Sequence, residues 1–292
     1  MNKTGICLVG GQPVPNLLPL GHLQPSRTIL VCSEDTKPVS ENLRKVLENK
    51  NKMDVSILKL DDPYDIANIK ERLEKHILEA TQDEEIIFNV TGGTKLMFYA
   101  AVRVAQEHKS KVVYLKSEKN KSLLYQYAFE DDELLQLGKP EVINEIITID
   151  DYLKIHIGEY SRRKKDINLF EQTVAEVLKK QVSELEPNIS FGTNTELDLV
   201  IRFGNQVGVA EVTTARKPGK NKIDQLNSAT RREALGTYTK RFFITSHKVE
   251  QNNRELAKIS GITIIELLSF QDGKLSDKDA KKLGCTIGDM FA

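Results

Sequence analysis

Apolar and polar positions follow two alternating periods along the first half of the chain. Short, nearly unbroken apolar runs recur as GICLVGG, RTILVCS, DVSILKL, EIIFNVTGG and KVVYLKS. Segments with helical periodicity lie between them, at about residues 39–51, 66–81 and 95–107. Alternating strands and helices with unbroken apolar strands predict a largely parallel sheet covered on both faces. Such a sheet binds its ligand beyond the carboxyl ends of its strands, where the loops at residues 10–15 and 91–95 are expected to meet.

The pattern changes after Tyr160. A helix with apolar positions over residues 169–178 precedes the strand-like runs ELDLVI and QVGVAEVT and, after another helix, RFFITS. This order predicts a smaller α/β unit with a mixed sheet. Residues 128–151 carry eight acidic side chains and one basic one, which is typical of a solvated hairpin and linker. We therefore predict an α/β protein of two domains, residues 1–150 and 151–292.

Composition narrows the choice of environment and partner. With 292 residues, of which 39% are hydrophobic, the chain has enough apolar material for about two cores. Its 42 basic residues balance 42 acidic ones, so any nucleic-acid signal must be local. No stretch resembles a signal peptide or a membrane span, and Cys7, Cys32 and Cys285 lack CxxC spacing. We expect a cytoplasmic protein that does not bind a membrane, with reduced core thiols.

The segment from Asn89 to Lys95 has the chemistry of a phosphate site. It follows a strand and opens a helix, Gly92 and Gly93 allow close approach of a ligand, and Lys95 adds a cation to the helix N-terminus. The spacing is neither that of a Walker A loop nor GxGxxG, and an ordinary capped βα turn is the alternative. Gln12, in the loop after the first strand, is a candidate base or ribose contact.

The combination of LVGGQPVPNLLPL near the start with NVTGGTK further on resembles the CARF domains of type III CRISPR ancillary effectors. The subgroup that joins a Rossmann-like CARF domain to a restriction-endonuclease-like domain is the most similar, and the resemblance covers nearly the whole chain. It implies a homodimer that binds a cyclic oligoadenylate, usually cyclic tetra-adenylate, as an allosteric activator of antiviral defence. The contact residues that it implies are Gly10, Gly11, Gln12, Asn89, Thr91, Gly92, Gly93, Thr94 and Lys95.

Two carboxylates in the second half form a candidate metal site. Asp198 lies in TELDLVI and Glu211 in VAEVTT, on strands joined by the turn FGNQ. A hairpin of this length brings both carboxylates to one end of a sheet, as a hard divalent cation requires. Both stand between apolar neighbours, where an unpartnered carboxylate is costly to bury, although plain strand-end charges are the alternative. Glu171, on the preceding helix, is a plausible third carboxylate.

The order Glu171, Asp198, Glu211 is similar to the PD-(D/E)xK nuclease core. The resemblance implies Mn²⁺ or Mg²⁺ held by Asp198, Glu211 and Val212, and hydrolysis of DNA or RNA. The usual lysine is replaced by Thr213, and that lysine would orient water and neutralise the transition state. Either it has moved to the following segment, or the metal alone suffices. The candidates there are Lys217, Lys220 and Lys222, with Gln225 as a further assisting residue.

Residues 202–241 carry nine basic side chains against three acidic ones, a field that favours a phosphate backbone. A solvated helix face explains Arg231 and Arg232 equally well. The leading hypothesis is a ligand-gated, metal-dependent nuclease. The second is a catalytically impaired sensor that binds nucleic acid or a partner without cleavage, for which Thr213 is the main support. A third, weaker hypothesis is that the N-terminal half degrades its own cyclic ligand.

Overall fold

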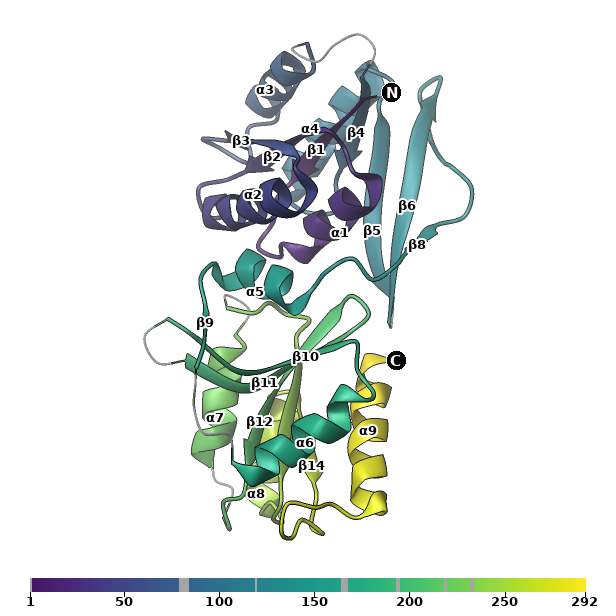
Figure 1. Cartoon of the computed structure of the whole chain (residues 1–292). Helices are drawn as coiled ribbons and strands as arrows, with labels where there is room; N and C mark the ends of the chain where they lie inside the picture. Colours follow the sequence, from purple (N-terminus) through teal and green to yellow (C-terminus); the bar gives the residue numbers. More distant parts are fainter. Residues whose placement is uncertain are drawn as a thin grey trace. The chain divides into compact units, whose positions relative to one another are not determined.

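The computed structural model describes residues 2–78, 84–118, 120–163, 168–192, 195–217, 220–231 and 234–292. The chain forms two compact units, drawn in Figure 1. The first comprises Met1–Ile147 and Lys154–His156, and the second comprises Thr148–Leu153 and Ile157–Ala292. Each unit has its own sheet and its own core, so each is described by itself.

The N-terminal unit is built on a largely parallel sheet. Its parallel strands are β1 (Lys3–Leu8), β2 (Arg27–Cys32), β3 (Asp54–Lys59), β4 (Glu85–Asn89) and β5 (Lys111–Glu118). Their order in space is β3-β2-β1-β4-β5. β2 and β3 follow β1 on one side, and β4 and β5 are added on its other side, so the order of the strands reverses at the β1–β4 pair. The loops that follow β1 and β4 therefore lie at the point where such a sheet opens a ligand crevice.

Helices cover both faces of this sheet (Figure 1). They are α1 (Val14–Leu23), α2 (Lys37–Asn51), α3 (Ile66–Leu78) and α4 (Lys95–Glu107). Leu8 and Phe88 pack with α3 and α4 on one face, while α1 and α2 pack on the other. Because both faces are buried, the strands are apolar without alternation, which confirms the α/β prediction with a mainly parallel sheet.

An antiparallel extension follows β5 in the same sheet. It consists of β6 (Lys121–Glu130), β7 (Glu133–Gln136) and β8 (Glu141–Ile143), with β7 and β8 both paired to β6. The acidic segment contains the expected hairpin, but it also contains β8 and the first residues of α5 (Ile149–Ile157) rather than a plain linker. The division between the two units falls within α5.

The C-terminal unit has a mixed sheet. Its strands are β9 (Ser161–Arg162), β10 (Glu184–Phe191), β11 (Thr195–Phe203), β12 (Gln206–Thr213), β13 (Lys240–Thr245) and β14 (Ile262–Glu266). They stand side by side in this order. The pairs from β9 to β12 are antiparallel, and those from β12 to β14 are parallel. The predicted mixed sheet is thus present, with β9, β10 and β14 added to the expected strands.

Two pairs of helices enclose this second sheet. The helices are α6 (Leu169–Lys179), α7 (Lys220–Ala229), α8 (Gln251–Ile259) and α9 (Asp277–Phe291). Phe170 of α6 and Phe291 of α9 join the core on the face formed by Leu199, Ala210 and neighbouring side chains, whereas α7 and α8 contact each other and the sheet. Residues of β12 alternate between the two helix layers, so Glu211 points away from the core that Ala210 and Val212 join.

The thiols divide into two groups. Cys7 and Cys32 are buried in strands, as expected, but Cys285 is exposed on α9, so its assignment to a core is wrong. An amphipathic helix presents one face to solvent, and Cys285 lies on that face. In the described part of the chain, no helix combines the length and the apolar character that a membrane crossing requires.

Candidate functional site

The loops after β1 and β4 meet at close range. Cys7 pairs with Asn89 in the parallel ladder, so both chains leave the sheet at the same level. A Cβ atom placed on Gly92 would lie 2.3 Å from the Leu8 carbonyl oxygen, and one placed on Gly10 would lie 3.2 Å from the Gly93 nitrogen. Gly93 adopts φ +78, which favours glycine. Three glycines therefore allow the two backbones to touch, while Gly11 has open space around it.

Asn89 holds this arrangement together from inside. Its side chain is 2% exposed, and its Nδ2 donates to the Pro15 carbonyl and to Asn16 Oδ1, each at 3.0 Å. Pro19 has no N–H, so within α1 the carbonyl of Pro15 lacks its usual helical donor, and Asn89 supplies one. Its Oδ1 accepts from the backbone N–H and the hydroxyl of Thr91. Asn89 therefore positions both loops and has little surface left for a ligand.

The two threonines of the loop are also engaged with the protein. The Thr91 hydroxyl donates to Asn89 and accepts from the Leu115 N–H at 2.8 Å. The Thr94 hydroxyl caps α4, accepting from the Met97 N–H at 3.1 Å and donating to the Pro63 carbonyl at 3.0 Å. The groups turned outward are the glycine backbone and the exposed Lys95. Gln12, whose Nε2 donates to the Gly11 carbonyl, is half-buried beside them.

In the C-terminal unit the sheet divides at the carboxylates. The β11–β12 ladder ends at the Leu199–Ala210 pair; beyond it β11 stays with β10 and β12 stays with β13. Asp198 and Glu211 are the first residues past this fork. Asp198 Oδ2 accepts from the Val212 N–H at 2.8 Å, a donor that the divided ladder leaves without a strand partner. The fork therefore brings the two carboxylates predicted from the sequence to one gap.

Lys222 enters this gap from the first turn of α7. Its Nζ forms an ion pair with Glu211 Oε1, and Glu211 is 3% exposed. Burial, followed by the charge of Asp198, raises the pKa of Glu211 to about 7, against the lowering effect of Lys222. Burial lowers the pKa of Lys222, but its hydrogen bond and charge interaction with Glu211 outweigh burial, so the pKa is raised. Lys222 therefore stays protonated and positively charged beside the two carboxylates.

Thr213 follows Val212, and its side chain bonds to the backbone nearby. Its hydroxyl accepts from the Ala215 N–H at 3.2 Å. Of the three lysines considered from the sequence, Lys222 contacts Glu211, whereas Lys217 and Lys220 are exposed. Gln225 is also exposed, on the same helix.

Glu171 approaches from α6. It is 7% exposed and, with Asp198, lines a hollow of about 120 Å³. Asn168, which sequence reasoning overlooked, caps α6: its Oδ1 accepts from the Glu171 N–H at 2.9 Å and its Nδ2 contacts Glu171 Oε1. An Asn followed three residues later by Glu is the capping-box spacing, so a signal for Asn168 was present in the sequence.

Asp198 and Glu211 can hold a divalent cation that keeps several of its water ligands. In the described residues, no three His, Cys, Asp or Glu side chains come together as a ready-made metal cluster. Mg²⁺ commonly keeps several waters and binds through one or two carboxylates, for which Asp198 and Glu211 suffice. The rise in the pKa of Glu211 caused by Asp198 is a like-charge repulsion that a cation between them would relieve. Val212 has only its backbone carbonyl to contribute.

The basic cluster of the C-terminal unit is partly consumed by structure. Arg202 donates to Glu184 at 2.9 Å, and Arg241 donates to the carbonyls of Thr230 and Ser260 at 2.8 and 3.1 Å. Arg232 and Glu233 lie outside the described residues. The basic side chains left exposed are Arg216, Lys217, Lys220 and Arg231. Fewer basic side chains are thus free to meet a phosphate backbone than the sequence suggests.

Comparison with known families decides the identity of the N-terminal unit. The Card1 CARF domain model matches residues 4–152. The chain belongs to the Card1 CARF domain family. The resemblance seen in LVGGQPVPNLLPL and NVTGGTK is therefore confirmed, and the loops that meet after β1 and β4 belong to the CARF domain. No curated protein matches the sequence.

Solved structures extend the likeness over both units. Can2 from Sulfobacillus thermosulfidooxidans, in complex with cyclic tetra-adenylate, is 19% identical, covers 100% of both chains and gives a TM-score of 0.77. Protein VC1899 from Vibrio cholerae is 14% identical over 99% of this chain and 98% of its own, with a TM-score of 0.75. A type III CRISPR defence DNA nuclease activated by cyclic oligoadenylate is 14% identical over 85% of this chain and 46% of its own, with a TM-score of 0.61. At these identities the likeness establishes the fold.

Proposed function

We propose that the protein is a metal-dependent nuclease of type III CRISPR defence that a cyclic oligoadenylate activates. The observation that carries this proposal is the pairing of a CARF domain with a second unit in which Asp198, Glu211 and Lys222 share one forked sheet end. Can2, whose fold is similar over the whole chain, is known in complex with cyclic tetra-adenylate, which makes that ring the first ligand to test.

The ligand loops have groups suited to a phosphate-rich ring. Asn89 and Thr91 fix the course of the glycine backbones, which favours binding of an anion by backbone N–H groups with little rearrangement. Lys95 adds a positive charge at the start of α4, where the helix dipole also favours an anion. Gln12 would hydrogen-bond a base or ribose. We propose a homodimer in which each CARF domain contributes one such set of loops to a single ring.

At the carboxylates, each side chain has a separate task. Asp198, fixed by the Val212 N–H, and Glu211 would hold Mn²⁺ or Mg²⁺ with the Val212 carbonyl, and Glu171 would orient water in the hollow that it shares with Asp198. When bound, the cation supplies a more acidic water and charge stabilisation at the scissile phosphate. Lys222 favours the ionised form of Glu211 against burial and Asp198, and would add positive charge where the transition state becomes more negative. A lysine from α7 would thus take the part vacated at Thr213.

Allosteric activation requires two states of the protein with different ligand affinity. We propose that the ligand-bound state brings the C-terminal carboxylates into a position to engage DNA or RNA. Purified protein incubated with supercoiled plasmid and single-stranded RNA, with and without Mn²⁺ or Mg²⁺ and cyclic tetra-adenylate, tests this directly. The proposal predicts cleavage that needs both ligand and metal and disappears in Glu211→Ala.

Thr213 favours one alternative, a catalytically impaired sensor. In that case the ligand binds tightly, yet neither plasmid nor RNA is cut at any metal concentration. A matched Glu255→Ala variant, in which an exposed carboxylate of α8 is removed, shows whether a loss in Glu211→Ala is specific to the fork.

A further inference from the structure

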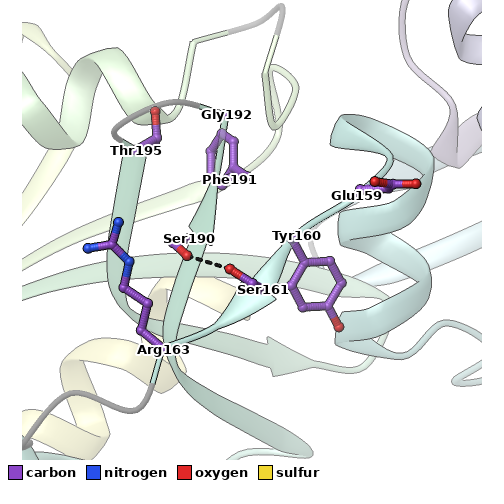
Figure 2. A pocket seen from close by; sticks show the side chains of 8 residues that line it. All are labelled: Glu159, Tyr160, Ser161, Arg163, Ser190, Phe191, Gly192 and Thr195. Carbon is purple, nitrogen blue, oxygen red and sulfur yellow. Dashed lines mark hydrogen bonds between the residues drawn. The ribbon is translucent and has the colours of Figure 1, made fainter.

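A second hollow lies in the C-terminal unit where β10 ends and β11 begins, beside β9. Its volume is about 450 Å³, within the range of small-ligand sites. It is lined by two aromatic side chains, three hydroxyls and an arginine, shown in Figure 2: Tyr160, Phe191, Ser161, Ser190, Thr195 and Arg163. In that view, the Arg163 guanidinium and the Tyr160 ring lie on either side of the serine pair. None of these residues belongs to the carboxylate site.

The hydroxyls of this hollow have hydrogen-bonding capacity to spare. Ser161 Oγ and Ser190 Oγ are 2.8 Å apart and share one hydrogen bond, and Ser190 is 8% exposed. A pair of hydroxyls has two hydrogens, and one of them suffices for this bond. The other hydrogen is left for solvent or for a polar group of a ligand.

Tyr160 is held as a fixed aromatic surface. Its hydroxyl donates to Asp150 Oδ1 at 2.7 Å, and the Arg162 guanidinium lies 5.7 Å from the ring centroid. Arg162 is itself paired with Glu186 at 2.9 Å. A ring held by these contacts loses little freedom when a second flat group stacks against it.

The charges of the hollow argue against a phosphate as its occupant. Arg163, its one cation among the lining residues, is ion-paired with Glu196, and Glu159 adds a carboxylate to the lining. What the hollow offers is two rings and several hydroxyls. This is the chemistry that stacks a neutral nucleobase and bonds its polar edge.

A narrow crevice shares one lining residue with the hollow and another with the carboxylate site. Arg163 lines both the hollow and the crevice, and Asp198 also lines the crevice. Ser190 pairs with Glu196 across β10 and β11, and Glu196 and Asp198 are two residues apart on one face of β11, which is about 7 Å along the strand. A nucleotide close to a phosphate bound at Asp198 can reach this distance.

We propose that the hollow binds one unpaired nucleobase of the nucleic acid that the protein cleaves, next to the scissile phosphate. The inference rests on the proposed nuclease function and adds to it a pocket for one base beside the cut, which a single strand, or a duplex with one base turned out, can fill. Recognition by stacking and a few hydroxyls gives weak sequence preference.

The test measures binding rather than cleavage. Fluorescence anisotropy, in EDTA with cyclic tetra-adenylate present, compares a labelled single-stranded oligonucleotide with versions carrying one abasic site at each position in turn. The proposal predicts one position at which loss of the base weakens binding by about five- to a hundredfold, from the usual strength of base stacking on an aromatic ring. Tyr160→Ala should abolish this sensitivity at that position.

Two variants keep the result interpretable. Tyr160→Phe preserves the ring and should keep the abasic sensitivity, and Tyr238→Ala removes a tyrosine that is 71% exposed and should change nothing. Equal binding of all abasic strands by the wild type, or sensitivity that survives in Tyr160→Ala, would overturn the base site. Positional sensitivity without cleavage in Mn²⁺ or Mg²⁺ would refute the nuclease and leave the base site standing.

Discussion

Glu211 is subject to opposing forces that only a charged partner can balance. Burial and Asp198 favour its neutral form, whereas Lys222 favours the carboxylate. A buried carboxylate without its cation is destabilising, so the pair is a functional arrangement more than a source of stability. Its neighbour Thr213, which stands where a lysine is usual, bonds to the local backbone and leaves the charge to α7.

Replacing Lys222 should therefore lower the cleavage rate. In Lys222→Gln we expect kcat to fall by about a hundredfold, the usual effect of losing one donor that stabilises transition-state charge. Lys220→Gln, two residues earlier and exposed, is the matched control and should stay within about threefold of wild type because surface charge alone contributes little. Single-turnover rates at saturating ligand and metal measure both. Equal rates for the two variants would remove Lys222 from the site.

The raised pKa of Glu211 also predicts how stability depends on pH without metal. Because its pKa of about 7 in the folded protein exceeds the ordinary 4.5, the folded state binds the proton more tightly than the unfolded chain. The stabilisation from Glu211 is complete below pH 4.5 and is lost as pH rises through about 7. Glu211→Gln cannot ionise, so at pH 8 its C-terminal unit should be more stable by on the order of 2 kcal/mol.

Thermal unfolding in EDTA at pH 5 and pH 8 checks this expectation. The midpoint of Glu211→Gln should exceed that of wild type by about 5 °C at pH 8 and by little at pH 5. Glu255→Gln, on the exposed surface of α8, should match wild type at both values. A Glu211→Gln protein that melts with or below wild type at pH 8 would contradict the burial argument.

At the scale of elements, the loops after β1 and β4 depend on close backbone contact. In Gly92→Ala the new methyl would lie 2.3 Å from the Leu8 oxygen and 2.9 Å from the Gly10 nitrogen, so one loop must move. We expect a loss of about 1–3 kcal/mol in the stability of the CARF domain. We also expect binding of cyclic tetra-adenylate to weaken at least tenfold.

Gly11→Ala is the control for this loop, since nothing lies within 4 Å of its added methyl. Its stability and ligand affinity, measured by calorimetry, should match wild type. If Gly92→Ala also binds ligand normally, the loops do not form the binding site.

The sequence predicts most of the elements that its periodicity marks clearly. The apolar runs at β1 to β5 and the helices between them are where the pattern places them, because strands buried on both faces leave an unbroken apolar signature. α1 was missed because Pro15, Pro19 and Gly21 indicate a loop. Burial of its leucines, and the Asn89 side chain that replaces one lost helical bond, outweigh that local preference.

The sequence predicts which residues form the candidate site better than it predicts which of them touch. Asp198 and Glu211 meet because a short hairpin fixes their register. Which of three lysines reaches Glu211 depends on where α7 packs, and no local pattern encodes that. The embedded position of Asn89 likewise depends on Pro15 and Asn16, which lie more than seventy residues away.

At the scale of the whole molecule, the proposed dimer sets the stoichiometry of sensing. One ring shared by two CARF domains should titrate at about half an equivalent per chain, because a ring on a two-fold axis uses the same loops twice. Light scattering for mass and isothermal titration for stoichiometry measure this together. A monomer that binds one ring per chain would contradict the shared site.

The dependence of cleavage rate on ligand concentration shows whether the CARF domain controls the C-terminal unit. Wild type, Lys95→Ala and Glu211→Ala are compared in Mn²⁺ across a range of cyclic tetra-adenylate. We predict that Lys95→Ala needs at least tenfold more ligand yet reaches the wild-type rate, since a lost charged contact costs about 1.5–3 kcal/mol. Glu211→Ala should bind ligand normally and not cut. A cleavage rate that is the same with and without ligand would show that the CARF domain does not control cleavage.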